Sequence, residues 1–417
     1  MPKRTIIKAV VLYDRGTRTE SRRIVVEGSR IAEVGAWSSG AGKPDAEGFV
    51  TPAFVDAHSH IGMFREGEPQ AEAEGNDKTA QIMPLSDPLN SIYFDDRAFA
   101  DAVDFGVLYS CVVPGSGNLV GGKAKVIRTF AKNRKDAVVC DYGYKMALGF
   151  NPRSTTEWKG ERPTTRMGLY QMLEKRFDEV LAKKAKGDLI LAKTLRDLSR
   201  SASEKGMGPK ELDVERDAAR RTAELEFSTE ELGLLDLLSG KKTVKVHVHK
   251  EDDALYLIDL AKRYRLRVTA EHCMDIHHRE IFDELARADI PIVYGPMGSL
   301  AYKVELKHED YRNAALLAKS RAQFGLMTDH PVILTYQLRD SLKYFLITGM
   351  SDAEALSIVT DRNARLLGLD ADLGSAEAGK LASLVVWDRE PLHLGAYPTL
   401  VLAEGTAVRR RKADSRG

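Results

Sequence analysis

The ends of the chain show short runs in which apolar and polar positions alternate. Near the N-terminus these runs are TIIKAVVLY (5–13), RRIVVEG (22–28) and RIAEVGAW (30–37), separated by charged or glycine turns. Strand character returns after residue 365, in GKLASLVVWD (379–388) and PTLVLAEGTAVRRR (398–411). A period of two is typical of half-buried strands. We therefore expect a small β unit in which the two ends of the chain, residues 1–50 and 366–417, fold together.

The middle of the chain, residues 51–365, alternates apolar strand-like runs with amphipathic helical stretches. The candidate strands are 54–60, 106–113, 137–148, 243–249, 267–273, 290–296 and 325–331. Helical patterns follow several of them, at 251–265, 278–289 and 313–323. This βα alternation predicts an α/β fold with a parallel sheet or a closed TIM-like (β/α)8 barrel. Seven of the eight strands that such a barrel needs can be recognised.

Two segments interrupt this alternation. Residues 151–240 are highly charged with a mostly polar helical periodicity, which predicts a helical insertion with a solvated face; a lid over an active site is the alternative. The stretch PGSGNLVGGKAKVIRT, Pro114 to Thr129, is rich in glycine and follows a strand. It lacks the spacing of a phosphate-binding P-loop, so we expect a loop that lines the barrel mouth.

Composition narrows the classes of partner. The 417 residues include 62 Lys and Arg against 61 Asp and Glu, so the formal net charge is +1 and no overall field favours nucleic acid or a membrane surface. The first apolar run is cut by Lys8 and Asp14, which is too short for a signal peptide, and no spanning segment follows. We expect a cytoplasmic protein with a small-molecule substrate. A homo-oligomer is compatible with the sequence, and the tail 409–417 is expected to be disordered.

Cysteine usage predicts no disulfide framework. Cys111, Cys140 and Cys273 are an odd set, widely spaced and without a CxxC pair. A thiolate zinc site is therefore not expected either, and the three residues are interpreted as buried apolar-type side chains.

The histidines are concentrated at the ends of predicted strands. His58 and His60 share one face of the first strand because side chains alternate along a strand. His247 and His249 end a later strand, His272 ends the next one, and Asp329 ends the last. A pair of hydrogen-bonded histidines would be the simplest explanation of one HxH. Four strands whose carboxyl ends open on one face of a barrel instead deliver these side chains to one mouth.

Imidazole nitrogens with one carboxylate oxygen are the ligands preferred by Zn, and they also suit Fe and Mn. A divalent metal with an open position lowers the pKa of bound water to about 7 and polarises a carbonyl. A metal-bound hydroxide would then be available at neutral pH, and Asp329 could accept a proton from the water and return it to a leaving nitrogen.

The order of these motifs resembles the amidohydrolase superfamily, specifically the imidazolonepropionase-like metal-dependent hydrolases. The resemblance rests on VTPAFVDAHSH, VKVHVH, TAEHC, MTDHP and the tail NARLLGLDADLGSAEAGKLASLVVWD, and it covers the chain except for residues 151 to about 222. It implies a barrel accompanied by a composite β-sandwich made from both chain ends. It also implies one or two divalent metal ions, most often zinc.

The resemblance assigns roles to individual residues. His58 and His60 are similar to the paired ligands of the first strand, and His272 is similar to the ligand of the sixth. On the fifth strand the ligand position corresponds best to His247, while His249 points the same way and could contact substrate or substitute for it. Asp329 is similar to the terminal Asp, which is both a ligand and the general acid and base; we group His272 with it as catalytic.

Two further residues have alternative interpretations. Lys145 in YGYKMALG resembles a lysine that many relatives carboxylate to bridge two metals; the alternative is a lysine that reaches from a strand end to solvent. Phe150 stands where close relatives often have an acidic residue, which weakens the case for a second metal. His330, adjacent to Asp329, should point away from the site and be structural.

The resemblance implies a hydrolase that cleaves a C–N bond, other than one in a long peptide, in a cyclic or linear amide. The alternatives are a deaminase of an aminated heterocycle, a dipeptidase-like amidohydrolase, and a non-catalytic scaffold. Deaminase relatives have a Glu three residues after the fifth-strand His, whereas this chain has Lys250 there and Glu251 one further on.

Substrate recognition is not fixed by these patterns. Candidates for binding a substrate carboxylate are Arg153, Arg162, Arg166 and Lys123. His277 and His278 are expected at the exposed start of a helix, and no role is assigned to His308 or His393.

Overall fold

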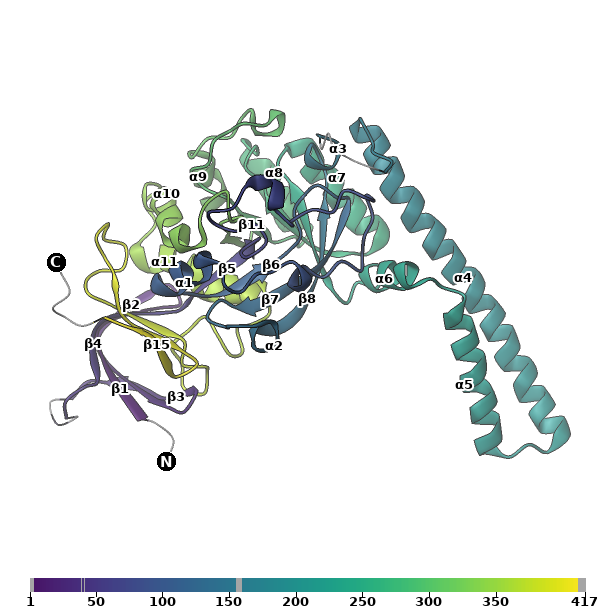
Figure 1. The fold of residues 1–417 in the computed structure, drawn as a ribbon, viewed down its shortest axis with the longest axis horizontal. Coiled ribbons are helices and arrows are strands. Elements are labelled where there is room, and N and C mark those ends of the chain that lie inside the picture. Colours follow the sequence, from purple (N-terminus) through teal and green to yellow (C-terminus); the bar gives the residue numbers. More distant parts are fainter. Residues whose placement is uncertain (1–3, 39, 41, 155–159, 412–417) are drawn as a thin grey trace.

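The computed structural model describes residues 4–38, 40, 42–154 and 160–411. It has two separate sheets, one of eight strands and one of seven. Helices surround the eight-stranded sheet, and the seven-stranded sheet lies at the side of the molecule where both termini are found (Figure 1). The α/β class and the TIM-like barrel with a composite β unit are both confirmed.

The eight-stranded sheet forms the barrel and carries the predicted histidines. Its strands are β5 (Phe54–Ser59), β6 (Val107–Val112), β7 (Val120–Arg128), β8 (Val138–Ala147), β9 (Thr243–Val248), β10 (Arg267–His272), β11 (Ile292–Tyr294) and β12 (Phe324–Leu326). They are hydrogen-bonded in chain order from β5 to β12. The seven strands expected from the sequence are all present, but β11 and β12 are shorter than predicted, and β12 ends at Leu326 instead of reaching Asp329.

Strand β7 corrects the sequence analysis, which assigned Pro114–Thr129 to a loop. β7 is the eighth strand, and it runs antiparallel to both β6 and β8, so the sheet is not wholly parallel. Gly115 and Gly117 precede the strand, whereas Gly121 and Gly122 lie within it. Gly122 has a φ of 130°, and a Cβ there would lie 2.4 Å from the carbonyl oxygen of Ser86. A glycine is required at this close approach of two backbone segments, whereas Ala124 to Ile127 are buried strand residues.

The two edges of the sheet meet, which nearly closes the barrel. The amide of Asp329 donates to the carbonyl oxygen of His58 (3.1 Å), and the amide of His60 donates to that of His330 (3.2 Å). Below them the buried Asn363 side chain donates to the carbonyl oxygens of Val55 (2.6 Å) and Leu326 (2.8 Å) and accepts from the amide of Leu326 (3.0 Å). Asn363 therefore supplies hydrogen bonds that neither edge strand obtains from a neighbouring strand.

Helices cover the outside of the barrel. They are α1 (Arg97–Asp104), α2 (Arg134–Ala137), α3 (Asn151–Ser154), α7 (Glu251–Tyr264), α8 (Arg279–Arg287), α9 (Asn313–Ala318), α10 (Lys343–Leu346), α11 (Asp352–Ser357) and α12 (Asn363–Leu366). The three helices predicted from the sequence correspond to α7, α8 and α9. Short 3-10 turns η1 to η4 occur at Gln70–Glu72, Pro88–Asn90, Val304–Leu306 and Thr335–Leu342, and a π-helical turn, η5, at Ile358–Arg362.

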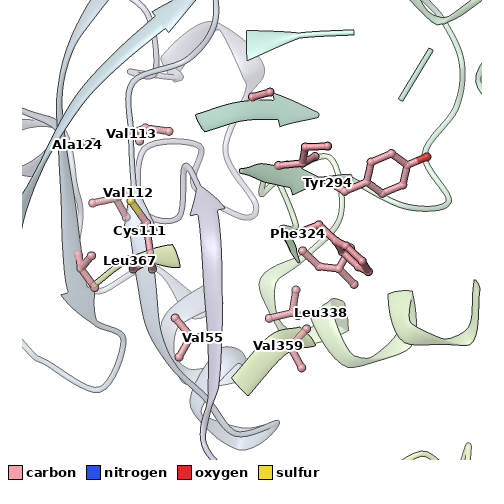
Figure 2. Close-up of a cluster of buried hydrophobic side chains, with 14 of the residues drawn as sticks. Val55, Cys111, Val112, Val113, Ala124, Tyr294, Phe324, Leu338, Val359 and Leu367 are labelled. Atoms are coloured by element: carbon pink, nitrogen blue, oxygen red, sulfur yellow. The ribbon is translucent and has the colours of Figure 1, made fainter. Parts of the chain in front are cut away.

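The main core lies between the barrel strands and the surrounding helices. Figure 2 shows part of it, where Val55 and Cys111 from β5 and β6 share one apolar cluster with Phe324 from β12 and with Leu338 and Val359 from the following turns. Burying a side chain of this size contributes roughly 1.5–3 kcal/mol. This cluster holds the ligand-bearing strands in fixed positions relative to one another.

The insertion is helical, as expected. It contains α4 (Arg166–Lys205), α5 (Pro209–Leu225) and α6 (Thr229–Leu237). The first part of α4 packs on α7, where the rings of Tyr170 and Tyr256 stack with centroids 3.6 Å apart. At 1.5 Å per residue, α4 is roughly 60 Å long. Its second half and α5 form a hairpin that projects away from the barrel (Figure 1).

The second sheet is formed by both chain ends. Its strands are β1 (Arg4–Asp14), β2 (Thr17–Glu27), β3 (Arg30–Ala36), β4 (Ala46–Pro52), β13 (Leu384–Trp387), β14 (Pro398–Ala403) and β15 (Thr406–Arg410), in the order β15-β14-β13-β4-β1-β2-β3. Buried Trp387 connects this sheet to the barrel, because its ring packs against that of Phe54, with the ring centroids 5.7 Å apart. The domain limits 1–50, 51–365 and 366–417 stay a prediction. Residues 412–417 of the predicted disordered tail lie outside the described residues.

Two expectations from composition can be compared with the structure. Cys111, Cys140 and Cys273 are free, and Cys111 and Cys273 are buried. In the described part of the chain, no helix is both long enough and apolar enough to cross a membrane.

Candidate metal centre

The predicted ligand residues meet at one end of the barrel. His58 lies in β5 and His60 directly after it, while His247 lies in β9 and His272 is the last residue of β10. The rings of His58 and His272, from opposite halves of the sheet, have centroids 5.2 Å apart, and those of His247 and His272 are 4.2 Å apart. All four side chains are buried.

Asp329 lies three residues beyond β12 and faces the same point. Its Oδ1 is 3.1 Å from Nε2 of His60 and 3.4 Å from Nε2 of His58, and its Oδ2 is 4.0 Å from Nδ1 of His272. The donor atoms fall into two sets: His58, His60 and Asp329 form one, and His247, His249 and His272 form the other. Within each set the donor atoms lie within 4.8 Å of one another. The sequence placed all of these residues at one mouth, and the structure brings them together there.

In each of four of these histidines, the Nδ1 atom makes a hydrogen bond to a neighbouring group. Nδ1 of His58 contacts Oε2 of Glu271 at 2.7 Å, and Nδ1 of His247 contacts Oγ of Ser116 at 3.0 Å. The carbonyl oxygens of Val113 and Gly295 accept from Nδ1 of His60 (2.7 Å) and His272 (3.1 Å). A histidine whose Nδ1 donates in this way can offer Nε2 as an acceptor, which is the usual arrangement of metal-binding histidines. The Nε2 atoms of His58 and His272 are buried without a hydrogen-bond partner.

The backbone turns sharply at two of these residues. His272 has a φ of 73° and Asp329 a φ of 51°, and Cys273 also lies in the left-handed region at 57°. Such conformations are unfavourable for residues other than glycine and are concentrated at functional sites. They explain an exception to strand alternation, since neighbouring Glu271 and His272 both contact the centre.

Burial determines the protonation of the imidazoles. The pKa values of His58, His247, His249 and His272 lie well below the ordinary value, chiefly because burial disfavours the charged ring. The rings are therefore neutral, as metal coordination requires. Burial alone would raise the pKa of Asp329, but its hydrogen bond with His60 and the nearby rings outweigh it and lower the pKa to about 2. Asp329 is thus a carboxylate at neutral pH.

Lys145 on β8 is completely buried in the barrel interior, so the prediction that it could reach solvent is wrong. Its Nζ donates to Oγ of Ser116 (2.8 Å) and to the carbonyl oxygen of Met146 (3.3 Å). Burial lowers its pKa to about 7. Lys245 on β9 lies beside it in register but differs, because Lys245 forms a buried ion pair with Glu271 at 3.0 Å.

The other residues predicted from the sequence occupy several different environments. His249 contributes a buried ring 4.7 Å from that of His247. His330 is buried, and its Nδ1 accepts from the amide of Thr335 (3.3 Å), which agrees with a structural role. Arg166 is bound to Asp253 (3.0 Å), and Nε of Arg153 donates to the carbonyl oxygen of Gly149 (3.3 Å). Arg162 and Lys123 are partly buried.

Three residues of the site were not found by sequence reasoning. Glu271 and Ser116 hold the Nδ1 atoms of two histidines, as described above. Glu305, in η3, is buried, and its Oε1 lies 3.3 Å from Nε2 of His247 and 4.0 Å from Nε2 of His249. Its other oxygen accepts from the amide of Phe150 (3.0 Å). Glu271 could have been noticed as an acidic residue inside an apolar strand, whereas no sequence signal indicates Glu305.

Comparison with known proteins shows similarity to amidohydrolases. A sequence model of the amidohydrolase family matches residues 210–409. The amidohydrolase tasK of Hapsidospora irregularis is 28% identical over 386 residues, which are 87% of this chain and 37% of that protein. The chain thus spans little more than a third of this curated relative. The crystal structure of an amidohydrolase from Thermotoga maritima MSB8 is 28% identical and superimposes with a TM-score of 0.81, covering 97% of this chain and 100% of that one.

Over residues 210–409 the chain is thus similar to the amidohydrolase family, and the Thermotoga maritima structure extends this similarity to nearly the whole chain. More distant solved structures share the fold, such as a Xaa-Pro dipeptidase with 15% identity and a TM-score of 0.56, covering 97% of this chain and 99% of that one. The finer resemblance to the imidazolonepropionase-like group stays a prediction.

The donor atoms of this site fit a divalent metal. Nε2 of His58, Nε2 of His272 and Nδ1 of His249 are buried and make no hydrogen bond. A buried acceptor without a partner is costly, so each such atom needs an explanation. Neutral imidazole nitrogens beside an ionised carboxylate are the ligands that zinc and related cations prefer.

Proposed function

We propose that this protein is a metal-dependent hydrolase that cleaves a C–N bond in a small cyclic or linear amide. The observation that carries the proposal is that contacts at Nδ1 anchor His58 and His272, while the Nε2 atoms of both rings are buried and make no hydrogen bond. A purely structural histidine cluster would not require its inner nitrogens to be left without hydrogen bonds. The similarity to amidohydrolases supports the same reaction class, a hydrolase that acts on carbon–nitrogen bonds.

The residues that would hold the metal are His58, His60, His247, His272 and Asp329. On β9 the preferred ligand is His247, whose Nδ1 is fixed by Ser116, and the alternative is His249, whose buried Nδ1 makes no hydrogen bond. A divalent metal bound there would supply Lewis-acid polarisation of the carbonyl and a water of lowered pKa.

The protein supplies the proton transfers. Asp329 is a carboxylate within reach of His60 and His58, so it can accept a proton from the attacking water at its Oδ atoms. The same carboxyl group can then donate that proton to the departing nitrogen. The histidine side chains are buried, so the barrel interior keeps bulk solvent away from the ligands.

Lys145 is the candidate for a second ligand group. The neutral amine can add to carbon dioxide and lose a proton, which gives a carbamate with two oxygens. Its Nζ lies 2.8 Å from Ser116, the residue that also holds His247, so a carbamate there would stand beside the proposed metal site. If Lys145 is carboxylated, the site would accommodate two metal ions. If Lys145 is not carboxylated, the site would hold one.

The deaminase alternative is less well supported. Oε1 of Glu251 accepts from the amides of His277 and His278 at 2.9 Å each, so its carboxylate is engaged outside the central site. Among the described residues, Glu305 is the carboxylate that lies within 4.0 Å of ring nitrogens of both His247 and His249. It is the residue that a deaminase would have to use for proton transfer. A dipeptide substrate also remains in the proposal, as a linear amide.

The test is metal analysis combined with a substrate screen. The purified full chain is analysed for Zn, Fe and Mn, treated with a chelator, reconstituted, and assayed on cyclic amides, N-acyl amino acids, dipeptides and aminated heterocycles. We expect stoichiometric metal and turnover of an amide that is lost with chelator and restored by metal. Ammonia release from a heterocycle would favour the deaminase instead. A chain without metal and without turnover would favour a scaffold and contradict the proposal.

A further inference from the structure

A second group of metal-binding side chains lies outside the central site. Three histidines, His277, His278 and His308, lie together with the carboxylates of Glu251 and Asp275. Their donor atoms fall into two sets, Glu251–His277–His278 and Asp275–His277–His308, and within each set the atoms lie within 4.8 Å of one another. The ring centroid of His277 is 4.4 Å from that of His278 and 4.1 Å from that of His308.

We propose that His277, His278 and His308, flanked by Glu251 and Asp275, form a separate zinc site on the outer side of the barrel mouth. This inference is independent of the proposed function, because it uses none of the residues of the central site.

The hydrogen bonds around the cluster hold the rings ready for binding. Nδ1 of His277 contacts the carbonyl oxygen of Asp275 at 2.8 Å, which leaves Nε2 of His277 as the acceptor. Nδ1 of His278 contacts both carboxylate oxygens of Glu251 at 3.0 Å. These are the carbonyl and carboxylate contacts that orient zinc-binding histidines. The carboxylate of Glu251 also accepts the amides of His277 and His278, so the loop that carries both rings is fixed.

Negative charge in this region favours a cation. Asp275 is buried and has two basic neighbours: Lys250 at 3.4 Å and the imidazole of His308, also at 3.4 Å. Glu309 lies close by, and Oε2 of Glu309 is buried without a hydrogen-bond partner. The carboxyl groups of Glu251, Asp275 and Glu309 therefore lie near few basic side chains. A bound divalent cation would balance their negative charge.

The site would connect three loops that follow ligand-bearing or neighbouring strands. Glu251 begins α7 directly after β9, Asp275 to His278 follow β10, and His308 lies between β11 and β12. A zinc ion bound to all three loops would fix the segments from which His247 and His272 project. Its expected role is therefore to stabilise the barrel mouth.

The experiment counts zinc in the full chain. Wild-type protein, a His278→Ala/His308→Ala variant and a His393→Ala control are saturated with zinc, separated from free metal and analysed for zinc content. His278 and His308 have side chains 62% and 41% exposed, so the double variant should fold, and circular dichroism verifies this. His393, on the loop between β13 and β14, is an exposed histidine outside both clusters.

We expect the double variant to bind one zinc ion per chain fewer than wild type, and the control to bind the same number as wild type. A Glu251→Gln variant, which keeps the acceptor for the two loop amides, should bind the outer ion at least tenfold more weakly. Equal zinc contents in wild type and the double variant would overturn the inference. So would a zinc loss in His393→Ala as large as in the double variant.

Discussion

Oε2 of Glu271 lies 2.7 Å from Nδ1 of His58, while the same carboxyl group forms an ion pair with Lys245 at 3.0 Å. All three side chains are completely buried. A carboxylate that accepts from Nδ1 fixes the tautomer of the ring and directs Nε2 toward the centre. Glu271 is therefore a positioning residue for the proposed metal ligand His58.

Replacing Glu271 by Gln should weaken metal binding. The amide keeps the size of the side chain but is a poorer acceptor for His58, and loss of such a contact typically costs about 10- to 100-fold in metal affinity. Competition with a chromogenic chelator measures the affinity. The exposed Glu280→Gln on α8 is the matched control and should bind metal as wild type does. Unchanged affinity in Glu271→Gln would contradict the positioning role.

Asp329→Asn should lower turnover more than it changes substrate binding. The variant loses the group that transfers the proton, and such a loss costs about 10²–10⁴-fold in kcat. Steady-state kinetics on the amide found in the screen give kcat and KM separately. The exposed Asp340→Asn serves as the control for removal of one carboxylate. If Asp329→Asn kept the full kcat, Asp329 would not be the proton-transfer group.

Lys145 should carry a carbamate when carbon dioxide is supplied. Its Nζ faces Ser116 and Met146 and forms no ion pair, whereas neighbouring Lys245 is held by Glu271. Of these two lysines, Lys145 is therefore the one that can readily offer a neutral amine. Incubation with ¹³C-bicarbonate should produce one carbamate resonance by NMR, which is absent in Lys145→Arg. A spectrum without this resonance, or a resonance that persists in the variant, would exclude carboxylation of Lys145.

Glu309 should make stability decrease as the pH rises. Burial, together with Asp275, raises its pKa from 4.5 to about 7, so the folded state favours the protonated form. The stabilisation is complete below pH 4.5 and is lost as the pH rises through about 7. Chemical unfolding of metal-free protein across this window should show a smaller loss for Glu309→Gln than for wild type. Glu280→Gln should follow wild type, and identical slopes for all three proteins would refute the prediction.

The sequence predicted the ligand strands well because two signals coincide in them. In β5 and β9 an apolar run with a period of two ends in His-x-His, so both the strand and the direction of the rings follow from the pattern. β7 was missed for a local reason, since the glycines before Ala124 outweighed a short buried run. At His272 the period of two fails, because a left-handed backbone turns the ring toward the centre.

The contacts around the ligands could not be predicted from the sequence. Glu305 lies 58 residues from His247 and reaches it from a 3-10 turn that has no periodic pattern. Ser116 lies in a segment assigned to a loop, and it is brought to His247 only by the folded barrel. Pairings of this kind depend on the arrangement of the whole sheet, which local propensity does not determine.

The most direct test of a metal centre at the barrel mouth is anomalous diffraction from crystals of the zinc-saturated full chain, recorded above and below the zinc absorption edge. The account predicts a peak bounded by Nε2 of His58, Nε2 of His60 and the carboxylate of Asp329. That peak would be distinct from any zinc beside His277. An anomalous map with no peak among His58, His60 and Asp329 would contradict the assignment.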